Sequence, residues 1–322
     1  MNVLVTGASG FVGRALVKRL GDMVGVRVIA AMRRPKDVSE IGGARAVIAV
    51  HGVACPLAQM DWSAALPGVE VVVHLAARVH IVAEHQADSL AEFRAVNVDG
   101  TLNLARQCAK AGVKRFVFLS SVKVNGEATR LGHPFAESDV PAPQDAYAVS
   151  KFEAEQGLLG LSAQTGMEIV IIRPPLVYGP GVKANFAALM RAVRRGWPLP
   201  LGAVRNRRSL VALDNLVDFI VLCHVHPLAA NQTFLVSDGQ DLSTPELVRG
   251  IAAAAGTRSR LVPVPAQIMR LAGALVGKRD AVQRLCGNLQ VDISKARGLL
   301  GWRPPITVDE GLRRALAGVA EP

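Results

Sequence analysis

A serine, a tyrosine and a lysine in the first half of the sequence have types and spacings suited to proton transfer. Tyr147 and Lys151, in "DAYAVSKFEAE", are four residues apart, so on a helix they share one face. The pKa of a free tyrosine is about 10, and a neighbouring ammonium lowers it by favouring the phenolate. Ser121, in "FLSSVKVNGE", follows a strand-like apolar run and adds a hydroxyl. These groups predict acid and base chemistry at a hydroxyl or carbonyl oxygen near neutral pH.

A glycine-rich loop near the N-terminus predicts a dinucleotide site. In "VTGASGFVG", Gly7, Gly10 and Gly13 follow a strand-like run and open a helix-like one. Such glycines permit a tight turn and close approach of the backbone to a pyrophosphate, while the helix N-terminus favours the anion. The alternative is a purely structural turn. A bound nicotinamide would make the serine, tyrosine and lysine suitable for hydride transfer.

The end of the second expected strand bears on the choice of dinucleotide. NAD-selecting folds commonly place an acidic residue there to bind the ribose, whereas this chain reads "AAMRRP", with Met32 at that position and Arg33 and Arg34 after it. Two guanidinium groups can hold a 2′-phosphate. NADP(H) is therefore the favoured cofactor, with NAD(H) possible, and the alternative is a pair of solvated surface arginines.

Alternating apolar runs and helical patterns must position these residues. Apolar runs at 2–7, 26–32, 46–50, 69–76, 115–121 and 168–174 are separated by helix-like segments that include 10–20, 90–112 and 145–166. This order predicts an α/β fold with a doubly wound parallel (Rossmann) sheet. Residues 1–175 are expected to form the NAD(P)-binding domain, with about 208–232 returning to it. Residues 176–322, rich in Pro and Gly, are expected to form mainly a smaller C-terminal substrate lobe.

Composition narrows the classes of partner. The 322 residues are 50% apolar and carry a net charge of +11, but no dense Lys/Arg run is interleaved with aromatic residues, which argues against nucleic acid. A phosphate-bearing small substrate fits the charge, as does an arginine-rich solvated surface. No apolar run reaches the length of a membrane-spanning helix, so we expect no membrane insertion and a cytoplasmic location. The widely separated cysteines predict free thiols and no metal site: Cys55, Cys108, Cys223 and Cys286.

Several motifs, in order, resemble those of the extended short-chain dehydrogenase/reductases of the nucleotide-sugar epimerase/dehydratase family. They are "TGASGFVG", "VVVHLAA", "VNVDGT", "FLSSVKVNGE", "YAVSK", "IIRPPLVYGPG", "RSLVALDNLVD" and "LLGWRPPITVDEGL", and they cover essentially the whole chain. The resemblance implies a UDP- or dTDP-sugar substrate. Tyr147 would be the acid and base, Lys151 would orient Tyr147 and the cofactor ribose, and Ser121 would hydrogen-bond the reacting oxygen.

The resemblance also implies further contacts. Besides the loop glycines, Arg33, Arg34, Tyr147 and Lys151, the expected cofactor contacts are Ser9, Phe11, Val12, Leu75, Ala76, Ala77 and Pro174. The expected substrate contacts are Arg78, His80, Lys123, Asn185, Arg208 and Arg284. An ion pair with Glu127 is the alternative role of Lys123, and Arg207 is the surface counterpart of Arg208. Asn97 lies near the active site or supports a helix. Family members imply a homodimer through the helices that start near Ala91 and Tyr147.

Two sets of three positions bear on the reaction. Dehydratases of this family have Thr-Asp-Glu where this chain has Ser121, Val122 and Lys123, so dehydration is not expected. Epimerases resemble one another in an acidic residue, an asparagine and a tyrosine where this chain has Met32, Leu176 and Asn125.

The favoured reaction is therefore NADPH-dependent reduction of a UDP-4-keto-6-deoxy-(N-acetyl)hexosamine, in the synthesis of surface-polysaccharide (lipopolysaccharide O-antigen) sugars. The alternative is a UDP-hexose 4-epimerase of the UDP-glucose 4-epimerase type with tightly bound NAD. A non-catalytic NADP-binding regulator on the same fold is a remote alternative, because fold alone does not fix function.

Overall fold

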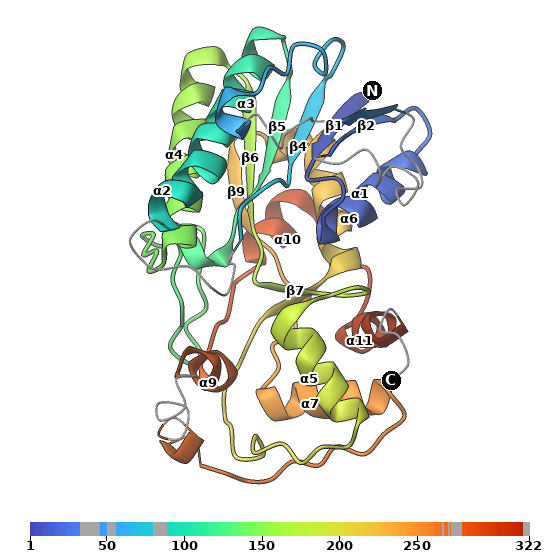
Figure 1. Cartoon of the computed structure of the whole chain (residues 1–322), viewed down its shortest axis with the longest axis vertical. Helices are drawn as coiled ribbons and strands as arrows, with labels where there is room; N and C mark the ends of the chain where they lie inside the picture. The colour runs from blue at the N-terminus through green and yellow to red at the C-terminus, as the bar shows by residue number, and fades with distance from the viewer. Residues whose placement is uncertain are drawn as a thin grey trace.

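Seven parallel strands form the main sheet, in the order β3-β2-β1-β4-β5-β6-β9 (Figure 1). The computed structural model describes residues 1–32, 46–49, 56–79, 89–265, 267–269, 271 and 279–317. The strands are β1 (Asn2–Thr6), β2 (Arg27–Met32), β3 (Ala46–Ala49), β4 (Val71–His74), β5 (Arg115–Leu119), β6 (Glu168–Arg173) and β9 (Gln232–Leu235). The strand order reverses between β1 and β4, and this is the edge at which such sheets bind ligands.

The strands form because both of their faces are covered. In β1, β4 and β6 nearly every residue is buried, as expected for continuous apolar runs in a parallel sheet. The register is regular, with Leu4 of β1 between Ile29 of β2 and Val72 of β4. Side chains alternate between the two faces, so Val3 and Val5 enter one core cluster and Leu4 enters the other.

Helices cover the two faces of the main sheet in separate layers. One face packs against α1 (Phe11–Gly21), α6 (Leu213–Val225) and α10 (Ser294–Leu300). The other packs against α3 (Gly100–Lys110) and α4 (Ala146–Thr165), with α2 (Ser89–Arg94) beside α4 (Figure 1). A capping Asp145 begins α4 and the left-handed Gly166 ends it. α4 contacts β6 and the one-turn helix that follows β5.

A smaller group of elements below the main sheet has its own core. A two-stranded parallel sheet pairs β7 (Leu176–Tyr178) with β8 (Leu210–Ala212). Around it pack α5 (Ala184–Arg194), α7 (Thr244–Ala254) and α11 (Val308–Ala317), and α9 (Arg279–Cys286) lies at the same end of the molecule (Figure 1). The buried side chains of this group include Tyr178, Phe186 and Met190.

The α/β Rossmann fold expected from the sequence is confirmed. The return of about 208–232 to the NAD(P)-binding domain stays a prediction. In this range β8 pairs with β7 in the small sheet, and the following strand, β9, joins the main sheet beside β6. The segment between them returns as α6, which packs on the main sheet against α1. The division of the chain near residue 175 stays a prediction.

Two further expectations concern the cysteines and membranes. Among the described cysteines, Cys108 and Cys223 are buried free thiols and Cys286 is partly buried, while Cys55 lies outside the described residues. Burial raises the pKa of the Cys108 thiol to about 12, so this thiol is unreactive at neutral pH. No helix in the described part of the chain has both the length and the apolar character needed to cross a membrane.

Candidate active site

Ser121 lies in a turn that follows β5. The backbone N–H groups on either side of it, from Ser120 and Val122, donate to the carbonyls of Ile172 (2.7 Å) and Pro174 (3.0 Å), at the end of β6. The Ser121 hydroxyl accepts a hydrogen bond from the backbone of Lys123 (3.2 Å) and so caps the one-turn helix Val122–Val124. Two neighbouring strand ends therefore hold the hydroxyl in place, and Pro174, an expected cofactor contact, borders it.

Tyr147 enters the site from the first turn of α4. Asp145 accepts the Ala148 N–H (2.7 Å), which fixes the start of the helix two residues before Tyr147. The Tyr147 ring meets the ring of Phe93, from α2, edge to face at 6.1 Å. Its phenol is hydrogen-bonded to Ser121. The structure thus brings together the serine and the tyrosine that the sequence separates by 26 residues.

Lys151 lies one turn further along α4 and is buried. Its Nζ donates to the carbonyl of Leu119 (2.9 Å), at the end of β5, and lies 4.4 Å from the centre of the Phe118 ring. Burial lowers the pKa of Lys151 to about 7, an effect that the nearby Glu155 carboxylate opposes. The lysine therefore changes its charge close to neutral pH.

The expected lowering of the Tyr147 pKa is wrong for the protein without cofactor. Burial raises that pKa to about 12, the Asp145 carboxylate adds to the rise, and the hydrogen bond with Ser121 opposes it. Lys151 does not offset this rise, because its Nζ is hydrogen-bonded to the Leu119 carbonyl and burial lowers its own pKa.

A buried ion pair behind the site escaped the sequence reasoning. Arg173, the last residue of β6, donates from Nη2 to Glu155 Oε2 (2.6 Å) and from Nε to Glu155 Oε1 (3.0 Å). Ser120, the residue before Ser121, donates to the same carboxylate (2.5 Å). Glu155 is four residues after Lys151, so it continues the face of α4 that carries Tyr147 and Lys151. That spacing was the one signal in the sequence that could have indicated Glu155.

The glycine loop fits a dinucleotide pyrophosphate. A Cβ at Gly13 would lie 2.1 Å from the Gly7 carbonyl oxygen, and one at Gly7 would lie 2.8 Å from the backbone of Ala76. These two glycines let the loop pack on the helix and on the end of β4. Gly10 differs, because it is exposed and a Cβ there would closely meet only the Gly7 oxygen (3.0 Å). The backbone at Gly10, at the N-terminus of α1, is thus open to a ligand.

Other expected cofactor contacts surround this loop. Leu75 and Ala76 continue from β4, where the N–H of Leu75 donates to the Thr6 carbonyl (3.3 Å). Ala77 follows them and is partly buried. Ser9, Phe11 and Gly10 line one end of a cavity of about 1040 Å³, which extends along α1 toward α6 and the loop before α5. The described lining of that cavity does not include Ser121, Tyr147 or Lys151, so it adjoins the cofactor loop and not the reacting groups.

Met32 does not have the role that the sequence suggested. It is 2% exposed and belongs to the core cluster under α1 and α6, so its side chain does not line an open ribose site. The presence of Met32 where NAD-selecting folds commonly have an acidic residue therefore does not distinguish NADP(H) from NAD(H). Arg33 and Arg34, on which the expectation of NADP(H) depended, lie outside the described residues, and so does His80.

Arg78 and Asn97 lie at the end of β4, near α2 and α4. Arg78 pairs with Glu92 of α2 (2.5 Å), and its guanidinium lies 5.8 Å from the Phe93 ring centre. The Asn97 side chain is buried and bonds the Arg78 N–H (2.8 Å), the Arg78 carbonyl (3.1 Å) and the Ser150 hydroxyl (2.9 Å). Asn97 thus supports a helix, one of the two roles considered for it, and it places Arg78 beside the ring that contacts Tyr147.

Lys123 is held by two carboxylates. Its Nζ donates to Glu127 Oε1 (2.8 Å) and to the side chain of Asp145. The ion pair with Glu127, the alternative role considered for Lys123, is therefore present. The contact with Asp145 was not foreseen, because 22 residues separate the two.

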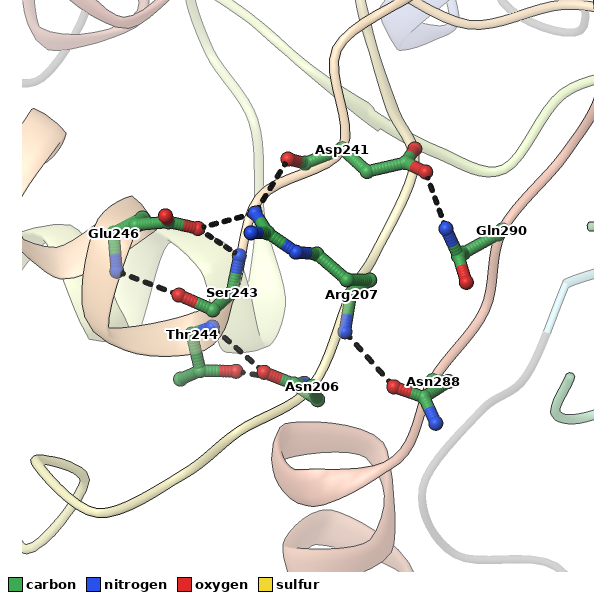
Figure 2. A network of polar contacts seen from close by, with 8 residues as sticks. All are labelled: Asn206, Arg207, Asp241, Ser243, Thr244, Glu246, Asn288 and Gln290. Atoms are coloured by element: carbon green, nitrogen blue, oxygen red, sulfur yellow. Dashed lines mark hydrogen bonds and ion pairs between the residues drawn. The ribbon is translucent and has the colours of Figure 1, made fainter. Parts of the chain in front are cut away.

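The arginines expected to bind the substrate lie in the smaller lobe. Arg208 donates from Nη1 to the carbonyl of Gly287 (3.1 Å), whereas the exposed Arg207 pairs with Glu246 of α7 (2.9 Å). Figure 2 shows Arg207 within a network that joins its loop to the start of α7 and to Asn288. Asn185 is exposed in the first turn of α5. Arg284 belongs to α9, but its side chain lies outside the described part of the chain.

Known proteins resemble this chain over nearly its full length. The model of the NAD dependent epimerase/dehydratase family matches residues 3–236. A UDP-glucose 4-epimerase of Vibrio cholerae is 49% identical over 319 residues, which are 97% of this chain and 94% of the relative. Among solved structures, MoeE5 in complex with UDP-glucose and NAD is 26% identical, has a TM-score of 0.74 and covers 99% of this chain and 98% of its own.

A more distant structure agrees in fold. The UDP-glucuronic acid 4-epimerase of Bacillus cereus, in complex with NAD, has a TM-score of 0.78 at 20% identity and covers 99% of this chain and 98% of its own. The sheet order, the glycine loop and the matched family model lead to one assignment. The chain is an enzyme of the NAD-dependent epimerase/dehydratase family.

Proposed function

We propose that this protein is an NAD(P)-dependent 4-epimerase of a UDP-hexose, of the UDP-glucose/UDP-galactose type. The observation that carries the proposal is the contact of Ser121 with Tyr147, one helical turn from Lys151 on α4. The 49% identity with a UDP-glucose 4-epimerase favours this reaction over 4-keto reduction, which ranked first on the sequence. Reduction is not confirmed by the comparisons.

Two of the three positions at which this chain differs from the epimerase pattern, Asn125 and Met32, have structural roles. Asn125 is buried, accepts a hydrogen bond from Arg173 Nη1 (2.9 Å) and donates to the carbonyl of Ala136 (3.0 Å). It therefore completes the network behind Ser120 and does not take part in the chemistry. Met32 is a core residue. Only Leu176, which is 49% exposed, is left as a departure at an accessible position.

The chain's own groups supply the proton steps of an epimerisation. The Tyr147 phenolate takes the proton of the C4 hydroxyl, and the Ser121 hydroxyl donates a hydrogen bond to the same oxygen. After the ketone turns over in its pocket, Tyr147 returns the proton. A bound nicotinamide supplies the hydride chemistry at C4, and the open backbone at Gly10 with the α1 N-terminus would hold its pyrophosphate. The cationic Lys151 would favour the phenolate.

The cofactor is proposed as NAD(P), with NAD as the form that suits an epimerase. In this reaction the hydride leaves and returns within one turnover, so a tightly held dinucleotide is sufficient. Dimerisation through α2 and α4, a cytoplasmic location and a role in surface-polysaccharide synthesis stay predictions.

The test is to give the purified protein UDP-glucose with NAD, and separately a UDP-4-keto-6-deoxy sugar with NADPH. We expect UDP-galactose to form in the first reaction without net consumption of dinucleotide. Stoichiometric oxidation of NADPH in the second reaction, with no interconversion in the first, would establish the reductase instead. Mass spectrometry of the dinucleotide that copurifies gives an independent measure of the cofactor.

A further inference from the structure

Lys123, Glu127 and Asp145 form a charged cluster that lies against the catalytic groups. The Lys123 ammonium contacts both carboxylates, and all three side chains are about one quarter exposed, at 27%, 27% and 23%. Lys123 belongs to the turn that begins at Ser121, and Asp145 caps the helix that carries Tyr147. The cluster therefore spans the two elements that supply the catalytic hydroxyls.

Each end of the Lys123–Asp145 contact is itself fixed to the site. The Lys123 backbone N–H donates to the Ser121 hydroxyl oxygen (3.2 Å). The other oxygen of the Asp145 carboxylate accepts the Ala148 N–H (2.7 Å) within the first turn of α4. The ion pair thus links Ser121 to the start of the helix on which Tyr147 lies.

We propose that Lys123 is a positioning residue: its ammonium binds the Asp145 carboxylate at the helix cap, two residues before Tyr147, offsets the negative charge of that carboxylate, and so favours the ionised form of Tyr147. The role of Tyr147 in catalysis rests on the proposed function, but the effect on its ionisation does not. In this proposal Lys123 acts through Asp145, and its expected contact with the substrate stays a prediction.

The electrostatics of the site agree with this geometry. Burial is the largest cause of the raised pKa of Tyr147, and the Asp145 carboxylate raises it further. Burial opposes the charge of Lys123, but its hydrogen bonds with Asp145 and Glu127 outweigh that effect, so the pKa of Lys123 lies above its ordinary value. Lys123 is therefore cationic at neutral pH.

Other charged groups lie on the elements packed around Tyr147. From α2 and the end of β4 come Glu92 and Arg78, which form an ion pair next to the Phe93 ring. On α4, Lys151 is bonded to Leu119, with Glu155 behind it. The variants below leave all of these groups unchanged, so a change in titration reports on the Lys123–Asp145 pair.

The chain permits a direct titration of Tyr147, because it has only two tyrosines. Tyr178 is fully buried and donates to Asp238 (2.7 Å). Burial, followed by the charge of Asp238, raises the pKa of Tyr178 far above its ordinary value. The near-ultraviolet absorbance of tyrosinate therefore reports Tyr147, and Tyr147→Phe gives the blank.

Ring-fluorinated tyrosine, incorporated in place of both tyrosines, lowers the phenol pKa and brings the titration into a range where circular dichroism shows a folded protein. The measurement uses the full chain without sugar, so it does not depend on turnover.

Two substitutions should move the titration in opposite directions. Asp145→Asn removes the charge but keeps an oxygen that can cap α4, and it should lower the midpoint by about one pH unit. Lys123→Met removes the cation that pairs with the Asp145 carboxylate and should raise the midpoint by about one pH unit. In the Asp145→Asn background, Lys123→Met should have a much smaller effect, because the group it restrains is gone.

The matched control is Glu153→Gln. Glu153 also lies on α4 and forms an ion pair with Arg94 (2.5 Å). Its substitution should leave the midpoint of the Tyr147 titration unchanged. Shifts of the two cluster variants in the same direction, or no shift in Asp145→Asn, would overturn the proposal. An inactive enzyme with the expected opposite shifts would refute the proposed function alone. In an active enzyme, the pH at which kcat rises should follow the titration.

Discussion

Lys151 is the residue whose charge depends most on its surroundings. Its ammonium has lost most of its water, and burial brings its pKa to about 7. Glu155 opposes this fall, but that carboxylate is also the partner of Arg173 and accepts from Ser120. One buried carboxylate therefore supports the turn before Ser121 and the charge of Lys151 together.

Removal of the Glu155 charge should be strongly destabilising. Glu155→Gln leaves the guanidinium of Arg173, which is 6% exposed, without a counter-ion, and breaking such a buried pair costs about 3–5 kcal/mol. Urea unfolding measures the loss. Glu153→Gln, which breaks a more exposed pair on the same helix, should cost less than about 1 kcal/mol. Equal losses of unfolding free energy in the two variants would contradict the claim that the buried ion pair contributes more than the exposed one.

Tyr147→Phe should remove the proton carrier and leave the fold. The expected loss in kcat is about 10²-fold to 10⁴-fold, with dinucleotide binding retained, because only one hydroxyl at the reacting centre is lost. Steady-state kinetics and calorimetric titration with NAD measure the two effects. Tyr178→Phe is the matched control, since its hydroxyl bonds Asp238 and should affect stability without this loss in kcat. Normal turnover by Tyr147→Phe would exclude it as the acid and base.

At the scale of elements, the glycine loop contains two kinds of glycine. Gly13→Ala would place a Cβ 2.1 Å from the Gly7 carbonyl oxygen, so it should destabilise the fold by about 3 kcal/mol or more. Gly10→Ala should change stability by less than about 1 kcal/mol but weaken dinucleotide binding about tenfold or more, because its Cβ would occupy the ligand side. Thermal unfolding and calorimetry separate these effects. If Gly10→Ala bound the dinucleotide with unchanged affinity, the pyrophosphate would not bind at the backbone of Gly10.

The ends of β1 and β4 are joined by His74, which makes stability depend on pH. Its ring nitrogens bond Thr6 (2.7 Å) and Thr101 (3.0 Å), and burial, followed by the charge of Lys151, lowers its pKa to about 3. The unfolded chain binds a proton at His74 below about pH 6.5 and the folded chain does not. The stability from neutral His74 is therefore complete above pH 6.5 and decreases as the pH falls toward 3.

This contribution is large enough to measure. Between neutral pH and pH 5, it should lower the free energy of unfolding by about 2 kcal/mol. Denaturant unfolding at both pH values checks the effect, and His74→Gln, though less stable throughout, should lack this part of the pH dependence. The same pH dependence in His74→Gln as in the unchanged chain would show that other groups cause it.

The sequence was sufficient for the elements with strong local patterns and insufficient for long-range partners. Strands such as β1 and β6 are continuous apolar runs, so their type followed from periodicity. The small β7–β8 sheet was missed because each strand has only three residues and the pairing joins Leu176 to Leu210. In the site, Ser121, Tyr147 and Lys151 had motif signals. Their supporting partners, Asp145 and Glu155, depend on contacts that only the fold creates.

At the scale of the molecule, the smaller lobe is tied to the main sheet by a few polar contacts. Asp238, just after β9, accepts from the Ala212 N–H (2.8 Å), Asn215 Nδ2 (2.7 Å) and the Tyr178 hydroxyl (2.7 Å). This carboxylate holds the small sheet and the start of α6 against the end of β9 (Figure 1).

Within the smaller lobe, a second network fixes the loop of Arg208. The buried Asn206 side chain accepts a hydrogen bond from the backbone of Thr244 (Figure 2). It also donates to the carbonyls of Leu285 (3.1 Å) and Gly287 (3.0 Å). The loop is therefore joined to α7 and to the end of α9. We expect this rigidity to hold Arg208 in place whether or not substrate is bound.

The most direct measurement of the central claim follows the hydrogen at C4 of the sugar. Purified protein with NAD is incubated with UDP-glucose that carries deuterium at C4, and the product is analysed by mass spectrometry and NMR. An epimerase of the proposed kind takes the hydride from C4 and returns it to the same carbon, so UDP-galactose should retain the deuterium at C4. Loss of the label to solvent, or no UDP-galactose while a 4-keto sugar is reduced with NADPH, would contradict it.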